Sequence, residues 1–187
     1  MTSLDDMAAG IAACIRCPAL VASRTHTVPG EFPNGAELLL VGEGPGAHED
    51  LAGRPFVGRS GALLDSLLLE VRMPRQEVAV ANVVKCRPPQ NRAPTRVEVD
   101  NCRPWLDQQL SRSAPRVVVA MGSTAVAWFF GRNSRISDLR GAAHQVDGRH
   151  VVATYHPSAA LRFGPKGAPR AALHDDLALA VSLCRRT

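Results

Sequence analysis

Four short apolar runs constrain the fold of this 187-residue chain more than any other feature of its sequence. The runs cover residues 37–41, 78–84, 116–121 and 150–154. Because each run is apolar throughout rather than alternating, it is typical of a strand buried on both faces of a parallel sheet. Helical patterns lie between and after the runs, at residues 60–71, 95–110, 122–130 and 168–183. This alternation predicts an α/β fold with helices on both sides of one sheet.

Composition and charge give only weak information about the partners and the compartment of the protein. The 22 basic and 17 acidic residues give a net charge of +5 and an isoelectric point of about 9.3, which is compatible with a polyanionic partner. No apolar run approaches the roughly 20 residues that a membrane-spanning helix needs. The acidic start of the chain is also unlike a secretion signal. We therefore expect a cytoplasmic protein with no membrane partner, and a monomer by default.

Four of the five cysteines form a second pattern. Cys14 and Cys17 make a CxxC pair, and Cys86 and Cys102 follow in the middle of the chain. In a reducing compartment, cysteines spaced in this way are more typical of metal ligands than of disulfides. Four thiolates suit a tetrahedral zinc ion or an iron–sulfur cluster, and spacing alone does not separate the two. We expect Cys184, near the end of the chain, to be a small buried or half-exposed thiol.

Polar loops follow three of the predicted strands, at residues 42–50, 82–92 and 155–162. Ligands of open parallel sheets bind beyond the carboxyl ends of the strands, so these loops point to one site. The first loop lacks both the GxGxxG spacing and the Walker lysine, which argues against a nucleotide cofactor. In the last loop Leu161 precedes Arg162, an apolar side chain beside a cation. That pair has the chemistry needed to enter a DNA groove and unstack a base.

Four motifs occur in order between Cys14 and the C-terminal helix. They are Gly42-Glu-Gly-Pro-Gly46 with Glu49 and Asp50, Gly53-Arg-Pro-Phe56-Val-Gly58, Asn82-Val-Val-Lys-Cys86-Arg-Pro-Pro-Gln-Asn-Arg, and His156-Pro-Ser158. Together with the cysteine quartet, they resemble the family 4 uracil-DNA glycosylases, the iron–sulfur members of the uracil-DNA glycosylase superfamily. Motif order, spacing and cysteines agree at once over nearly the whole chain, which makes the resemblance more specific than any single motif.

The resemblance implies a fold and a cofactor. The expected fold is a three-layer α/β/α sandwich with a central four-stranded, mainly parallel sheet, in a single domain covering residues 1–187. The expected cofactor is a structural [4Fe–4S] cluster in a lobe formed by residues 14–17 and 86–102, which decides against zinc. Its ligands would be Cys14, Cys17, Cys86 and Cys102. We expect nearby cations to offset the negative charge of such a cluster: Arg16, Lys85, Arg87 and Arg103.

The resemblance also implies an activity, namely flipping uracil out of DNA and hydrolysing its N-glycosidic bond to leave an abasic site. In the base pocket, which Gly42 helps to form, Phe56 would stack on the uracil ring. Asn82 would read the edge of the base, donating to O4 and accepting from N3–H, a pattern opposite to that of cytosine. Glu49 would crowd the 5-position and exclude thymine.

The remaining implied roles concern bond cleavage and the grip on DNA. His156 would donate a hydrogen bond to O2 and stabilise the uracil anion as it leaves. Glu43 would position or activate the attacking water and balance the positive charge that develops on the sugar. Ser158, Leu161 and Arg162 would pinch phosphate and fill the gap left in the base stack.

Three alternatives stay open. One is the uracil-trapping type of the superfamily, which forms a covalent DNA adduct and carries an extra basic loop with a histidine; here the sequence runs from Val84 to Pro88 without an insertion. Another is a broad-specificity glycosylase for deaminated bases, although such relatives usually lack an acid at the position of Glu43. The third is a non-catalytic, metal-stabilised DNA-binding module, which would not need Glu43, Asn82 and His156 at three strand ends.

Overall fold

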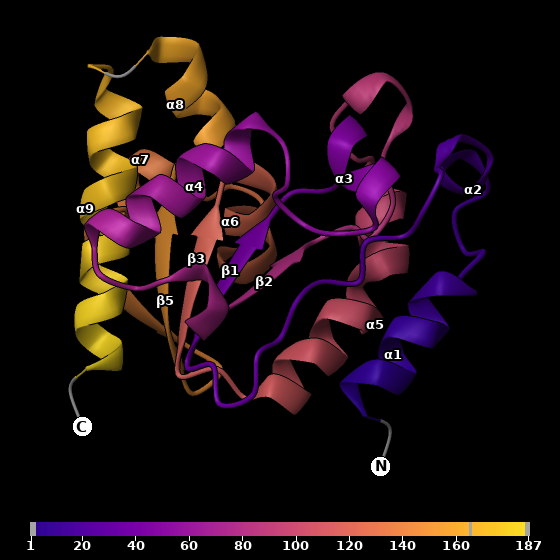
Figure 1. Cartoon of the computed structure of the whole chain (residues 1–187), viewed down its shortest axis with the longest axis horizontal. Coiled ribbons are helices and arrows are strands. Elements are labelled where there is room, and N and C mark those ends of the chain that lie inside the picture. The colour runs from indigo at the N-terminus through magenta and orange to yellow at the C-terminus, as the bar shows by residue number, and fades with distance from the viewer. Residues whose placement is uncertain (1–2, 165, 186–187) are drawn as a thin grey trace.

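The computed structural model describes residues 3–164 and 166–185, and within them one five-stranded sheet forms the centre of the molecule (Figure 1). The strand order is β2-β1-β3-β5-β4. The strands are β1 (Leu38–Gly42), β2 (Val78–Asn82), β3 (Val117–Met121), β4 (Ala143–Val146) and β5 (Arg149–Thr154). All neighbouring strands pair in parallel except β4, which runs antiparallel to β5 at one edge.

The predicted α/β fold is confirmed, and the sheet has one strand more than expected. The four predicted strands occupy their predicted places to within two residues. The additional strand, β4, was not predicted because its sequence, Ala-His-Gln-Val, is short and polar and its residues are partly exposed. An antiparallel strand at the edge of an otherwise parallel sheet is common in α/β proteins.

Two pairs of helices cover the two faces of the sheet. On one face, α4 (Arg59–Glu70) and α9 (Ala168–Cys184) bury leucines against alternate residues of the strands. On the other face, α5 (Arg96–Ser113) and α6 (Ser123–Phe130) do the same with their own apolar side chains. Because alternate residues of a strand point to opposite faces, continuous apolar runs supply both cores. The expected three layers are therefore present.

The remaining helices are short or lie outside these layers. Figure 1 shows α1 beside α5, at the outer side of that layer. The others connect the main elements or follow strand ends: α1 (Leu4–Ala12), α2 (Pro18–Ser23), α3 (Ala47–Ala52), η1 (Arg75–Glu77), η2 (Pro89–Asn91), α7 (Ile136–Leu139) and α8 (Pro157–Phe163). No helix in the described part of the chain is both long and apolar enough to cross a membrane.

The register of the strands brings the polar loops together. Gly42, the last residue of β1, pairs with Asn82, the last residue of β2. On the other side of β1, Met121 of β3 pairs with Thr154 of β5. The loops that follow these strands therefore start at one edge of the sheet, where the sequence predicts the site.

Candidate active site

A cavity of about 450 Å³ opens at the carboxyl ends of the strands. This volume lies in the range of pockets that bind small molecules. Six residues singled out in the sequence line it: Glu43, Glu49, Phe56, Asn82, His156 and Ser158. They come from the loops after β1, β2 and β5, so the structure brings these three loops into one site.

Gly42 leaves room for two of the side chains in this cavity. A Cβ atom on Gly42 would lie 2.6 Å from Oδ1 of Asn82 and 2.6 Å from Cζ of Phe56. Contacts this short do not occur for real Cβ atoms, so any larger residue would push the amide or the ring out of place. Glycine at the end of β1 thus lets the amide and the ring converge on the space above it.

Asn82 carries an unused hydrogen-bond acceptor. The residue is only 2% exposed, and its Oδ1 atom has no hydrogen-bond partner among the described residues. A buried polar atom without a partner costs on the order of 1–3 kcal/mol, so such atoms are rare and call for an explanation. Its position in the cavity wall suggests that a ligand with an N–H group completes the bond.

Phe56 has an unusual backbone conformation. Its φ of 52° lies in the left-handed region, which costs an L-residue about 1–2 kcal/mol. The turn packs so closely on α4 that a Cβ atom on Gly61 would lie 1.8 Å from the Phe56 carbonyl oxygen. The Phe56 ring is buried, and its centroid lies 5.6 Å from that of the His156 ring. The turn therefore presents a flat apolar face to the cavity beside the imidazole.

His156 is held in one protonation state by its surroundings. Burial lowers its pKa from the ordinary 6.5 to about 4, so the ring is neutral at pH 7. The backbone N–H of Ser158 donates to Nδ1 at 3.2 Å, and the Ser158 hydroxyl lies 2.9 Å from the same atom. Because a backbone N–H can only donate, Nδ1 must accept, and the proton of the neutral ring lies on Nε2. His156 can thus act as a neutral hydrogen-bond donor.

Glu43 is oriented by a residue of helix α6. The hydroxyl of Thr124, in the first turn of α6, donates to Oε2 of Glu43. Downstream of the paired residues of β1 and β2, the Val84 N–H also donates to the carbonyl of Glu43 at 3.0 Å. The carboxylate is therefore fixed at the wall of the cavity, where it can accept a hydrogen bond from water.

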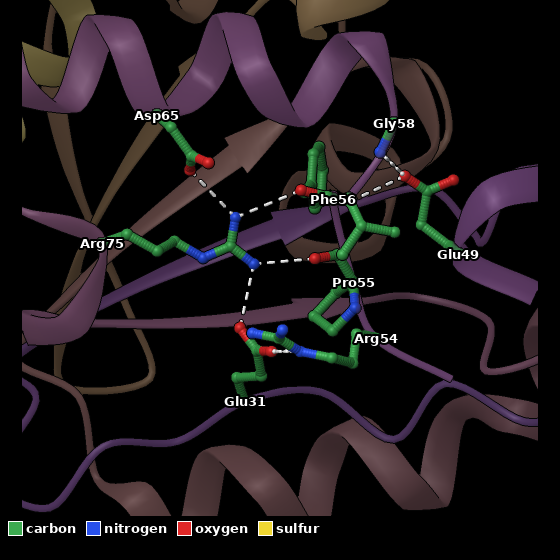
Figure 2. Close-up of polar contacts among 9 residues, drawn as sticks. Glu31, Glu49, Arg54, Pro55, Phe56, Gly58, Asp65 and Arg75 are labelled. Atoms are coloured by element: carbon green, nitrogen blue, oxygen red, sulfur yellow. Dashed lines mark hydrogen bonds and ion pairs between the residues drawn. The ribbon is translucent and has the colours of Figure 1, made fainter. Parts of the chain in front are cut away.

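Glu49 bonds to the loop that carries Phe56. Its Oε1 accepts the N–H groups of Val57 and Gly58 at 3.0 and 2.8 Å, the second of which is labelled in Figure 2. Its Oε2 accepts the N–H of Gly46 at 3.1 Å. These three bonds give Glu49 a structural role that the sequence did not suggest. Because its side chain also lines the cavity, its predicted contact with the 5-position of uracil stays a prediction.

The predicted DNA-contacting residues lie on α8, whose first turn follows His156. Ser158 is exposed and lines the cavity as well as bonding to His156. Leu161 and Arg162 are exposed on the same short helix but lie outside the cavity lining. The geometry thus separates Ser158, which faces the site, from a pair at its periphery.

Cys14, Cys17, Cys86 and Cys102 line a second cavity, between α1, α2 and α5. Three of their sulfur atoms accept hydrogen bonds. Arg24 Nη1 lies 3.1 Å from Sγ of Cys86, the Lys85 N–H lies 3.3 Å from Sγ of Cys102, and Asn101 Nδ2 lies 3.7 Å from Sγ of Cys17. Burial raises the pKa of Cys102 to about 11 and also raises the pKa values of Cys17 and Cys86. Without a metal these three are therefore neutral thiols.

The cations around the cysteines differ in part from those expected. Arg24, which was not among the expected cations, bonds to Sγ of Cys86 through its side chain. Arg16 bonds to Asn101 and lies over the ring of Trp105, Arg87 bonds to Asn91, and Arg103 lies over the ring of Trp128. No three His, Cys, Asp or Glu side chains in residues 3–164 and 166–185 converge closely enough to hold one metal ion.

Lys85 connects the cysteine cavity to the cavity at the strand ends. Its side chain is 1% exposed, and Nζ donates to the carbonyl of Asn82 at 2.7 Å and to Oε1 of Gln109 at 2.6 Å. Burial lowers its pKa from 10.5 to about 8. Because its backbone N–H bonds to Sγ of Cys102, one residue joins a cysteine to the backbone of Asn82.

Sequence reasoning missed several residues that shape the site. Thr124 and Arg24 are ordinary polar residues in the sequence, and nothing local indicates their partners. Arg75 is another: it precedes β2 and bonds to the loop that carries Phe56 (Figure 2). Each of these contacts joins residues at least 19 positions apart, so the signal lies in the fold and not in any motif.

Comparison with known proteins shows the family of the chain. Residues 29–178 match the profile of the uracil DNA glycosylase superfamily. A type-4 uracil-DNA glycosylase from Archaeoglobus fulgidus is 41% identical over 86% of this chain and 84% of its own length. One from Thermotoga maritima is 45% identical over 80% of this chain and 78% of its own length. A type-5 uracil-DNA glycosylase from Pyrobaculum aerophilum is 32% identical over 82% of each chain. The chain therefore belongs to the uracil-DNA glycosylase superfamily and, within it, to the type-4 uracil-DNA glycosylases.

Proposed function

We propose that this protein repairs DNA by flipping uracil into the cavity at the strand ends and hydrolysing its N-glycosidic bond. The observation that carries the proposal is the unused Oδ1 acceptor of Asn82, buried in the cavity wall beside Phe56. Uracil supplies what this arrangement lacks, a planar ring with an N–H group on its edge. The names of the type-4 relatives agree with this assignment.

Recognition of the base follows from these two residues. The ring of Phe56 would stack on the flipped uracil. The amide oxygen of Asn82 would accept the N3–H of uracil, and its NH₂ group would donate to O4. Cytosine presents an acceptor at N3 and a donor at its exocyclic amine, so a fixed amide would leave both polar pairs mismatched. Mismatches of this kind discriminate by about 10⁴-fold or more.

Cleavage would use the neutral imidazole and the fixed carboxylate. As the bond between N1 and the sugar breaks, its electron pair leaves with uracil, and negative charge develops at O2. Nε2–H of His156 would donate to that oxygen and stabilise the anion. Glu43, held by Thr124, would position or activate the water whose oxygen bonds to the sugar carbon, would accept the proton that this water loses, and would balance the positive charge there.

Residues of α8 would make the contacts with DNA outside the cavity and at its mouth. Ser158 lies at the mouth of the cavity, where its hydroxyl can reach a phosphate next to the flipped nucleotide. Leu161 is 36% exposed and would fill the gap that the flipped base leaves, while Arg162 would pair with phosphate. Glu49 remains our candidate for excluding the methyl group of thymine.

The four cysteines fit a [4Fe–4S] cluster better than a single zinc ion. Each thiolate in such a cluster binds a different iron, so the sulfurs surround a volume and do not meet at one point. That matches four cysteines that share a cavity although no three of them, all within the described residues, converge on one ion. Hydrogen bonds to three of the sulfurs suit thiolate ligands. Bound there, the cluster would supply cross-links between residues 14–17 and 86–102, not a chemical step.

We also propose that the chain acts as a single domain and as a monomer, in a reducing compartment such as the cytoplasm. All five cysteines are free in the described part of the chain, as that compartment requires. The second candidate function is broad-specificity excision of deaminated bases, which the sequence leaves open. The carboxylate of Glu43 in the cavity supports the first candidate.

Matched oligonucleotides test the function. Purified protein should create alkali-labile sites in a uracil-containing strand and none in its thymine twin, single- or double-stranded. Asn82→Ala and His156→Ala should each abolish most excision while keeping the iron content of the wild-type protein. Full activity in either variant would contradict the assigned roles. A protein–DNA band that survives boiling would instead indicate the uracil-trapping type, and excision of hypoxanthine or xanthine would indicate the broad-specificity type.

A further inference from the structure

Arg75 lies under the loop that carries the stacking ring, although it takes no part in the proposed chemistry. It belongs to η1, directly before β2, and its side chain is 19% exposed. Nη2 donates to the Pro55 carbonyl at 2.7 Å, and Nη1 donates to the Phe56 carbonyl at 3.3 Å (Figure 2). The planar fork of the guanidinium thus bonds to two successive carbonyl groups of one turn.

These two bonds fix both peptide groups that flank Phe56. The Pro55 carbonyl belongs to the peptide group before Phe56, and the Phe56 carbonyl belongs to the one after it. The second peptide group is also held from its other side, because the Val57 N–H donates to Oε1 of Glu49 at 3.0 Å. With both planes held, φ and ψ of Phe56 are set, and with them the direction in which its side chain leaves the backbone.

The turn needs such support because Phe56 is strained. A φ of 52° is unfavourable for an aromatic residue, and a residue in this region persists only when its surroundings hold it there. Without the two carbonyl bonds, Phe56 can relax toward ordinary backbone angles. Its ring would then leave the position above Gly42 and beside His156.

Arg75 is itself held in place by two acids. Nη1 also donates to Oδ1 of Asp65 on α4 at 3.1 Å, and Nη2 donates to Oε2 of Glu31 at 3.0 Å. Arg54 pairs with the other oxygen of Glu31 at 2.7 Å, but its side chain is 66% exposed (Figure 2). The guanidinium therefore has little freedom to turn away from the two carbonyls.

We propose that Arg75 is a positioning residue for base recognition, which sets the angle of the Phe56 ring against the flipped uracil. The proposal rests on the proposed function, since it assigns Arg75 a role in that site. A purely structural role for Arg75 would also explain its contacts. The two roles differ in one respect: a positioning residue loses its effect on excision once the ring it positions is absent.

A double-mutant cycle on excision separates the two roles. Arg75→Met and Arg75→Lys should each lower the single-turnover excision rate by about 10²-fold in the wild-type background, the scale expected for a group misplaced by about 1 Å. A lysine side chain keeps the positive charge but not the planar fork, so Arg75→Lys should fold even if Arg75→Met does not. Inhibition by free uracil should weaken in parallel, while the KM for DNA changes little because phosphate contacts are untouched.

In a Phe56→Ala background, either change at Arg75 should alter the excision rate by no more than about twofold. Arg54→Met is the matched control, because Arg54 shares Glu31 with Arg75 yet bonds to neither Pro55 nor Phe56; it should leave excision unchanged. Effects that simply add, or an equal loss in Arg54→Met, would overturn the inference. Wild-type protein that fails to excise uracil at all would instead refute the proposed function.

Discussion

The shape of the cavity at the strand ends depends on Gly42, which has no side chain. Gly42→Ala would place a Cβ atom 2.6 Å from both the Asn82 amide and the Phe56 ring. We expect excision to fall by about 10²-fold or more, since the groups that we propose to hold the base would be displaced. The strand itself tolerates alanine, so circular dichroism should show an intact fold. Wild-type excision rates in this variant would show that the two side chains do not converge on the base.

The lowered pKa of His156 predicts how excision depends on pH. Burial lowers its folded pKa to about 4, while the unfolded ring titrates near 6.5. The ring is therefore neutral and able to donate from Nε2 throughout pH 6–8. Single-turnover excision should show no change that follows titration near 6.5. Any change that depends on His156 should begin only as the pH falls toward 4, where a proton on Nδ1 would oppose the N–H of Ser158.

The same shift affects stability with a definite sign. Between pH 6.5 and 4 the unfolded chain takes up a proton at His156 that the folded chain does not, so this group destabilises the fold as the pH falls. His156→Gln should reduce that acid dependence in thermal unfolding. A rate profile with an inflection at 6.5 in the wild-type protein would mean that the pKa of His156 is not lowered in the folded protein.

Residues differ in how far the sequence alone reveals them. Asn82, Phe56 and His156 could be singled out because each lies in a short motif that resembles those of a known family. Asn82 and His156 also lie at or just after strand ends, where the fold class places ligands. Their roles stay predictions. The role of Arg75 could not be predicted, since it depends on carbonyl groups that become accessible only when the loop adopts its left-handed turn. Glu49 shows the intermediate case: its place in the site was predicted, but its three backbone bonds were not.

Among the elements, the start of α5 is the clearest case of electrostatic stabilisation. Arg92 donates to both oxygens of Glu98, at 2.8 and 2.6 Å, and the Thr95 N–H donates to Oε2 at 2.7 Å. These bonds, those from Arg92 foremost, lower the pKa of Glu98 to about 2. The stabilisation is therefore complete above the unfolded pKa of about 4.5 and is lost as the pH falls from there toward 2.

Glu98→Gln tests this element. At pH 7 it should lower the free energy of unfolding by about 1–3 kcal/mol, because charge-assisted bonds are lost at a buried position. The difference from wild type should shrink as the pH approaches 2. Asp100→Asn is the control: its pairs with Arg96 and Arg132 are long and exposed, so it should change stability little. A pH-independent effect of Glu98→Gln would show that packing, not charge, is involved.

Elements were predictable where burial or capping leaves a pattern in the sequence. The predicted helix at 95–110 begins with a capping box between Thr95 and Glu98 that the structure contains. The four parallel strands were predictable because burial on both faces requires continuous apolar residues. Strand β4 and the short helices α3 and α8 could not be predicted, since segments of four to seven residues are too short to show a clear hydrophobic periodicity.

At the scale of the whole molecule, the cysteine cavity joins the N-terminal segment to the segment that carries Asn82. Cys102→Ser should lower iron content, melting temperature and excision together, because the cluster we propose would cross-link these segments. The control is Cys184→Ser, whose thiol is buried on α9 away from that cavity, and which should keep the iron. A stable, fully active Cys102→Ser protein without iron would contradict the proposal. So would colourless wild-type protein that contains zinc.

The burial of Lys85 has a practical consequence for solution experiments. The chain has two lysines, Lys85 and Lys166. Lys85 is enclosed by its bonds to Asn82 and Gln109, whereas Lys166 is exposed between α8 and α9. Amine-reactive dyes should therefore attach to the folded protein at Lys166 and at any free α-amino group. A fluorophore at Lys166 would lie next to the helix that carries Leu161, which gives a one-step labelling route to follow DNA engagement in real time without altering any residue of the site.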